Sequence, residues 1–158
     1  MSIGPIVYLT TPSDTSTSQI APVGTMRAYN HSTYGHQIYK SVKCGEAGVT
    51  EGIAVSYKSG TLTDEVVLPA GTNEPNYLVA GIAQNAIANA SYGWVLVSGE
   101  GVGMATGTTS AEAALATSGA AGKITGTTPG AVEHCIFGSI VTGASADALA
   151  RVRVRGLI

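Results

Sequence analysis

The chain has 158 residues, which is enough for one domain with a hydrophobic core and too short for two domains of ordinary size. Only 11% of the residues are charged, eight basic and ten acidic, against about a quarter in typical soluble domains. The formal net charge of -2 argues against a dedicated nucleic-acid-binding protein, which needs a basic face, and 44% hydrophobic residues argue against a disordered chain.

The low charge also bears on what covers the surface. A freely soluble monomer usually keeps about a quarter to a third of its surface positions charged. Two explanations stay open: other chains cover much of this surface, or the protein is a small secreted β-protein coated with Thr and Ser. Composition alone favours neither.

The N-terminal segment differs from the rest of the chain. It contains four consecutive apolar residues, Ile6, Val7, Tyr8 and Leu9. A hydroxyl-rich stretch with a single charge follows over residues 11–18. We expect an extended arm over residues 1–24, ahead of a single β-domain over residues 25–158. A disordered N-terminus is the alternative, but it would leave the four apolar side chains in water, so we expect the arm to dock on a neighbouring chain.

From Gly24 onward, short apolar runs alternate with turn residues, above all glycine, at a spacing typical of an all-β sandwich or barrel. The runs predict strands over residues 26–29, 37–43, 53–57, 65–68, 78–87, 94–98, 101–106, 122–125, 135–141 and 150–155. We therefore expect an all-β fold, a compact β-barrel or β-sandwich with the extended N-terminal arm.

The last predicted strand has the clearest alternation. Its period of two places Arg151, Arg153 and Arg155 on one face and valines on the other. The valine face is expected to be buried. The arginine face is expected to meet acidic groups across an interface, and a solvated strand face is the alternative.

At most one short helix is expected. Thr109 and Glu112 have the spacing of a capping box ahead of an alanine-rich stretch, and Gly119 is placed to end the helix. The alanines over residues 80–90 also favour helix by propensity. There we expect strand, because Gly81 and two asparagines weaken a helix and a turn follows.

The cysteines and histidines do not indicate a metal site. Cys44 and Cys135 allow one disulfide at most, so two free, buried thiols are expected. No metal-ligand spacing joins these cysteines to the three histidines, His31, His36 and His134. The N-terminus also lacks the basic start and apolar stretch of a signal peptide, which indicates synthesis in the cytoplasm.

Other functional motifs are absent as well. No G-x-S-x-G nucleophile elbow occurs. The glycines 99, 101 and 103 depart from G-x-G-x-x-G, because Met104 stands where the third glycine should be. They predict a tight turn and a strand that another backbone approaches closely. We expect neither an enzyme nor a cofactor.

The uncharged stretch between Glu74 and Glu100 is long enough to cross a bilayer, but asparagines, Pro75 and Gly81 interrupt it. We expect it to be buried or interfacial rather than a membrane span.

Tyrosines supply the one candidate binding loop. Tyr29 and Tyr34 flank the sequence Asn-His-Ser-Thr, the nearest approach in this chain to the aromatic platform of a sugar-binding module. Such a loop is equally suited to a subunit or capsid contact, so both alternatives stay open.

Two regions together resemble the small decoration, or cement, proteins of tailed-phage capsids. The first comprises residues 48–55, 79–87 and 92–99, and the second comprises residues 121–125, 137–141 and 151–154. These are structural β-patterns rather than catalytic signatures. The arm before Gly24 and an insertion over residues 58–77 depart from the resemblance, so the mode of docking cannot be carried over.

The resemblance implies a structural virion protein without catalysis, made in the host cytoplasm and bound to the outer surface of an icosahedral phage head. Its implied partners are the major capsid protein and two further copies in a homotrimer, with neither nucleic acid nor membrane. The residues expected at the interfaces are Ile6, Val7, Tyr8, Leu9, Tyr29, Tyr34, Arg151, Arg153 and Arg155. The alternative is a head-fibre or receptor-binding module that recognises host surface glycans.

Overall fold

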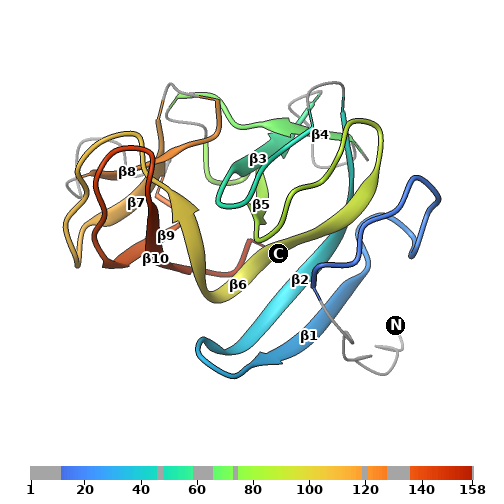
Figure 1. The fold of residues 1–158 in the computed structure, drawn as a ribbon, viewed down its shortest axis with the longest axis horizontal. Coiled ribbons are helices and arrows are strands. Elements are labelled where there is room, and N and C mark those ends of the chain that lie inside the picture. Colours follow the sequence, from blue (N-terminus) through green and yellow to red (C-terminus); the bar gives the residue numbers. More distant parts are fainter. Residues whose placement is uncertain are drawn as a thin grey trace.

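The computed structural model describes residues 12–45, 48–58, 66–72, 75–118, 121–127 and 136–157. These residues form strands and turns and contain no helix, which confirms the all-β prediction (Figure 1). The strands are β1 (Met26–His31), β2 (Gly35–Cys44), β3 (Ala54–Tyr57), β4 (Val66–Pro69), β5 (Val79–Ala83), β6 (Tyr92–Met104), β7 (Ala114–Thr117), β8 (Ile124–Thr127), β9 (Gly138–Thr142) and β10 (Leu149–Val154).

The strands form one ten-stranded sheet in the order β1-β2-β4-β3-β5-β6-β10-β9-β7-β8. An additional pairing of β2 with β6 closes the strands β2, β4, β3, β5 and β6 on themselves. We call this closed unit the first lobe. Its strands pair antiparallel, except that β2 and β4 run parallel.

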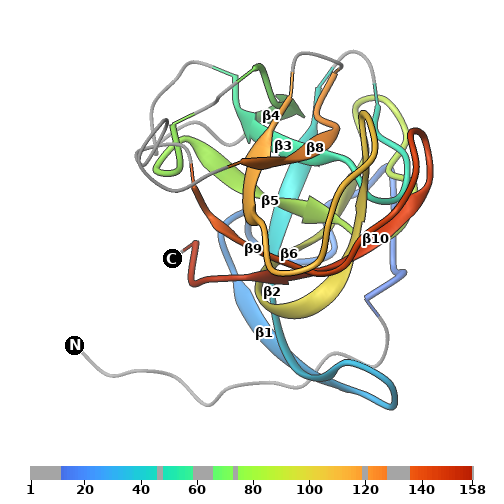
Figure 2. The ribbon, with the colours of Figure 1, turned by 90° about the vertical axis from the view of Figure 1, so that its left-hand side faces the viewer.

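The second lobe consists of β10, β9, β7 and β8 together with the end of β6. Antiparallel pairing joins these strands in that order. A parallel bridge between Ala105, directly after β6, and Ile124 of β8 completes the circuit. Figure 1 shows β6 running from the first lobe into the second, while the β1–β2 hairpin extends away from both lobes in Figures 1 and 2.

The long β6 corrects the sequence interpretation, which divided it into two strands with a turn at Gly99. Gly99 instead continues the strand with φ +106, a conformation that strongly favours glycine. A Cβ atom there would lie 2.6 Å from the His36 carbonyl oxygen. The predicted close backbone approach is therefore confirmed and the predicted turn is wrong.

Two clusters of buried side chains form the core. One joins residues from every strand of the first lobe and fills its interior, including Val42, Val55, Val67, Ala80 and Val95. The other spans both lobes, including Ile82, Leu96, Leu115, Ile140 and Val152. β3, β5 and the first part of β6 are therefore buried on both faces.

The short helix predicted after Thr109 does not form. The Thr109 hydroxyl accepts a hydrogen bond from the Ala144 amide at 3.0 Å instead of capping a helix. Glu112 has φ 67 and donates its amide proton to the Ile140 carbonyl, and β7 then begins at Ala114. Pairing with β9 thus outweighs the local helix propensity of the alanines.

The strand predicted over residues 78–87 is shorter than expected. β5 ends at Ala83, and Ile87 forms an isolated bridge with Val49. Ile87 and the residues Trp94 to Val97 are buried, as expected for this uncharged stretch. In the described part of the chain, no helix is long and apolar enough to cross a membrane.

The described part of the predicted arm, residues 12–24, contacts this chain's own sheet. Ser16 pairs with Tyr92, with N–O distances of 3.1 and 2.8 Å, and Ala21 is buried in the core. Residues 6–9, which carry the apolar part of the arm, lie outside the described residues.

Candidate functional site

The predicted interface residues fall in two parts of the structure. Tyr29 lies in β1, and Tyr34 lies in the turn that joins β1 to β2. Arg151 and Arg153 lie in β10, and Arg155 follows it. The remaining four, Ile6, Val7, Tyr8 and Leu9, lie outside the described residues.

Two of the three arginines meet an acidic group, and it belongs to this chain. The register of β10 and β6 places Arg153 opposite Glu100. Arg151 donates to Glu100 Oε2 from Nε at 2.9 Å and from Nη2 at 2.5 Å, and Arg153 donates to Oε1 from Nε at 3.1 Å and also from Nη2. Val152 and Val154 are buried on the opposite face, as the alternation predicted.

Glu100 is the best-shielded member of this triad. Its side chain is 14% exposed, against 39% for Arg151 and 57% for Arg153. The hydrogen bonds from Arg153, followed by those from Arg151, hold the pKa of the Glu100 carboxyl below its ordinary value despite partial burial. Sequence reasoning missed Glu100, because only the pairing of β6 with β10 brings it between the arginines.

The β1–β2 turn brings an aromatic pair to the same place. His31 Nδ1 accepts hydrogen bonds from the amides of Thr33 at 3.0 Å and Tyr34 at 3.3 Å, which fixes the turn. The rings of His31 and Tyr34 stack with centroids 4.6 Å apart, and the Arg151 guanidinium lies 5.4 Å from the Tyr34 centroid. Tyr34, Arg151 and Arg153 thus join one cluster with Glu100, whereas Arg155 lies elsewhere.

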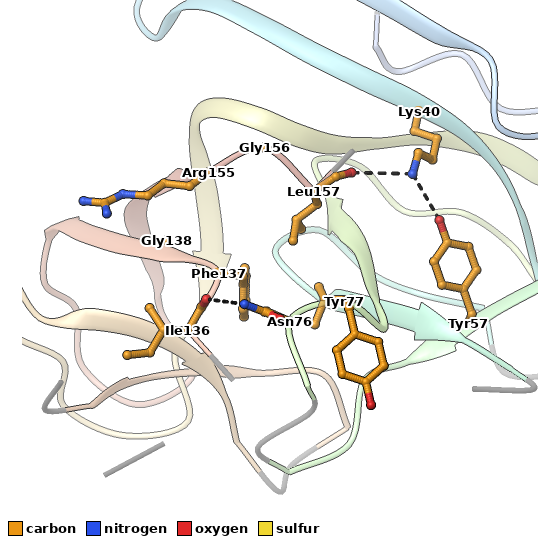
Figure 3. A pocket seen from close by; sticks show the side chains of 11 residues that line it. Lys40, Tyr57, Asn76, Tyr77, Ile136, Phe137, Gly138, Arg155, Gly156 and Leu157 are labelled. Carbon is orange, nitrogen blue, oxygen red and sulfur yellow. Dashed lines mark hydrogen bonds between the residues drawn. The ribbon is translucent and has the colours of Figure 1, made fainter. Parts of the chain in front are cut away.

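Arg155 lines a groove of about 510 Å³ where the two lobes meet (Figure 3). Lys40 of β2 donates to the Tyr57 hydroxyl at 3.1 Å and to the Leu157 carbonyl at 3.5 Å. On the side of the second lobe, the Asn76 amide donates to the Ile136 carbonyl at 3.3 Å. These hydrogen bonds connect residues of β2, of the segment before β5 and of the C-terminal segment at the edge of the groove.

The groove is cationic and partly aromatic. Lys40 and Arg155 are its charged residues, and none of the described lining residues is acidic. Tyr77, in the segment before β5, is 62% exposed, the most exposed large hydrophobic residue among those described. Tyrosine and arginine are enriched where protein interfaces gain most of their energy. The groove therefore combines residue types that are frequent in protein interfaces with a positive charge.

The candidate metal ligands that the structure describes make other contacts. His36 Nδ1 lies 3.1 Å from Asn30 Oδ1, and the free thiol of Cys44 is buried in the first lobe, which raises its pKa. His134 and Cys135 lie outside the described residues. Within the described ranges, no group of three or more His, Cys, Asp or Glu side chains is placed to hold a metal ion.

The comparisons with known proteins support the fold. No protein-family model and no curated protein sequence matches the chain. Among solved structures, the chain is similar to the N base of the head fibre protein gp8.5 of bacteriophage phi29, with 15% sequence identity and a TM-score of 0.56. The match covers 74% of this chain and 92% of that one. At this identity the likeness shows a shared fold.

Proposed function

We propose that this chain is a structural protein of a tailed-phage virion, bound to the outside of the head. The observation that carries the proposal is the similarity of its fold to the base of a phage head fibre, almost all of which is matched. Low surface charge supports it, because a surface covered by other chains needs few charged side chains. The role needs no catalysis: a protein that binds only the assembled shell stabilises that shell by mass action.

Within this role, we favour a capsid decoration protein, a homotrimer whose copies contact the major capsid protein. The groove between the lobes has a chemistry suited to that contact. Arg155 has no acidic partner among the described residues, and the Tyr77 side chain, which lines the same groove, is largely exposed. An acidic loop of the capsid surface would complement both.

A second candidate is the base of a head fibre. The similar solved structure is described as the base of such a fibre, which favours this alternative. Both candidates place the domain on the head, and they differ in what projects from it. A decoration protein leaves a compact knob on the shell, whereas a fibre base carries an elongated projection.

Binding to phage heads that lack the protein tests the proposal. The full chain is expected to co-sediment with expanded heads, and cryo-electron microscopy should show it at regular outer sites, with a knob or a fibre distinguishing the two candidates. Light scattering of the free protein is expected to give the mass of a trimer. Failure of the protein to bind heads under any ionic condition would contradict the virion role.

Variants locate the contact. Removal of residues 1–11 is expected to weaken attachment without unfolding the domain, whereas a cut at residue 20 would also remove the pairing of Ser16 with Tyr92.

Arg155→Ala and Tyr77→Ala are each expected to weaken head binding about tenfold, as loss of a contact worth ~1.4 kcal/mol would. Lys123→Ala removes a cation of the second lobe that pairs with Asp147 instead, and it serves as the matched control. Equal binding by all variants would exclude the groove and the arm as contacts.

A further inference from the structure

A second pocket, of about 390 Å³, opens beside the β1–β2 hairpin, away from the groove between the lobes. Its size falls within the range of about 300–1,000 Å³ that is typical of small-molecule sites. Tyr29, His31 and Tyr34 line one side, and Glu51, Gln84 and Asn85 also contribute. From its lining we propose that this pocket binds one neutral hexose unit of a surface polysaccharide.

The aromatic side is held rigid. The rings of His31 and Tyr34 are stacked, and Tyr29 meets His31 edge to face at 6.1 Å and Tyr39 at 6.5 Å. The C–H groups on one face of a pyranose are weakly positive and pack favourably on the negative face of an aromatic ring. Because His31 and Arg151 both lie against the Tyr34 ring, this wall is fixed and loses little conformational entropy when a sugar binds beside it.

The amides are fixed as well. The Gln84 side chain pairs with the backbone of Val102 through both of its polar atoms, each at 2.9 Å. The Asn85 amide donates to the Pro12 carbonyl at 3.2 Å. Each side-chain amide keeps further donor or acceptor capacity after these bonds. Such preorganised groups suit the hydroxyl groups of a sugar.

Three polar groups of the pocket have no hydrogen-bond partner among the described residues: the carboxylate of Glu51 and the hydroxyls of Tyr29 and Tyr34. A carboxylate only accepts hydrogen bonds, whereas a tyrosine hydroxyl both donates and accepts. Adjacent hydroxyls of a hexose offer donors and acceptors in the same small volume. The pocket thus has complementary partners for several sugar hydroxyls at once.

The charge of the pocket selects the class of sugar. Its described lining contains one carboxylate and neither lysine nor arginine. Arg151, which lies 5.4 Å from the centroid of the Tyr34 ring, is already paired with Glu100. An acidic sugar or a phosphate would therefore face Glu51 without a free compensating cation, which costs binding energy. The pocket therefore favours a neutral hexose, in contrast to the groove between the lobes, whose described charges are cationic.

Saturation-transfer NMR on the full chain tests this proposal with methyl glycosides of glucose, galactose, mannose and N-acetylglucosamine, and with glucuronic and N-acetylneuraminic acids as anionic probes. We expect transfer to at least one neutral glycoside and none to the acids. Glu51→Gln replaces one accepting carboxylate oxygen by a donating NH2 group, and Tyr29→Phe and Tyr34→Phe each remove a hydroxyl. All three keep the shape of the side chain, so each should weaken binding about fivefold, as loss of a ~1 kcal/mol hydrogen bond does.

Two matched variants outside the pocket serve as controls. Glu112→Gln and Tyr77→Phe make the same chemical changes at exposed positions and should bind as the unmodified chain does. Transfer that the pocket variants do not reduce would overturn the proposal, as would transfer to the acids alone. Absence of transfer to every neutral glycoside would also overturn it. Head binding is measured separately, so a failure here leaves the proposed virion role intact.

Discussion

The two lobes share β6 but bury their strands differently. In the first lobe, all five residues of β5 are buried, as are five consecutive residues of β6, Gly93 to Val97. In the second lobe, burial alternates along β9 and β10, so that one face of each strand is packed and the other is at least partly exposed. The difference follows from position: the first lobe packs around its own interior and also against the core that it shares with the second lobe.

This contrast shows what an apolar run in a β-protein means. A strand that is covered on both faces is apolar at successive positions. A strand with one open face alternates between apolar and polar residues. Arg151 and Arg153 reach Glu100 on the open face of the second lobe, and Tyr34 of the β1–β2 turn joins them there. The charged side chains of β10 thus gather on the face of the second lobe that is left uncovered.

The largest expected effect tests whether the lobes are independent. Leu115 lies in β7 of the second lobe, is fully buried, and belongs to the core cluster that spans both lobes. Leu115→Ala is expected to lower the free energy of unfolding by about 3 kcal/mol through lost packing and a cavity. Because the cluster includes Trp94 of the first lobe, urea unfolding followed by tryptophan fluorescence should show the full loss.

The same experiment can separate the lobes. If the Trp94 transition keeps its midpoint while circular dichroism shows an earlier unfolding step, the two lobes unfold separately. Thr142→Ala changes an exposed position of the second lobe and serves as the control, with an expected change within about 0.5 kcal/mol.

A glycine series tests the continuity of β6 between the lobes. At Gly99, alanine would be strained by φ +106 and would also meet the His36 carbonyl at 2.6 Å, so a loss of about 2–3 kcal/mol is expected. At Gly35, φ +71 strains the backbone but nothing lies within 4 Å, so the expected loss is about 1 kcal/mol. Gly107 has neither constraint, and its alanine variant should be nearly neutral. Thermal unfolding of the three variants gives the order, and equal losses at Gly99 and Gly35 would contradict the close approach.

The smallest expected effect concerns the open face of the second lobe. Glu100→Gln removes the charge between Arg151 and Arg153 and should cost about 1 kcal/mol near neutral pH. The pKa of Glu100 is lowered by folding, so its ion pairs stabilise the protein fully above the ordinary carboxyl pKa, about 4.3. That stabilisation is lost as the pH falls through the lowered pKa of the folded state.

Melting temperatures measured from pH 7 to pH 2.5 provide the check. The difference between the unmodified chain and Glu100→Gln should be largest above about pH 5 and should shrink on acidification. Glu112→Gln, an exposed carboxylate without a described ion pair, should give no such difference. A difference that persists unchanged at the lowest pH would show that the effect of Glu100 is not electrostatic.

Several features of the candidate sites could be predicted from local patterns, and others could not. The alternation of residues 151–155 indicated an arginine face, and the spacing of Tyr29 and Tyr34 indicated an aromatic loop. Glu100 gave no local indication of its role, because it lies 51 residues before Arg151 and meets it only through strand pairing. Glu51 and Gln84 likewise join Tyr29 in one pocket although they are far from it in sequence.

Local hydrophobic periodicity and glycine punctuation determined the all-β class and the approximate positions of most strands, because side-chain direction alternates with each residue of a strand. Only the tertiary structure decided that β6 is one strand, that residues 114–117 form β7 rather than part of a helix, and that the first lobe closes through β2 and β6. These features depend on hydrogen bonds between segments distant in sequence. The free energy of those bonds belongs to the pair of strands, so neither strand's own sequence reveals it.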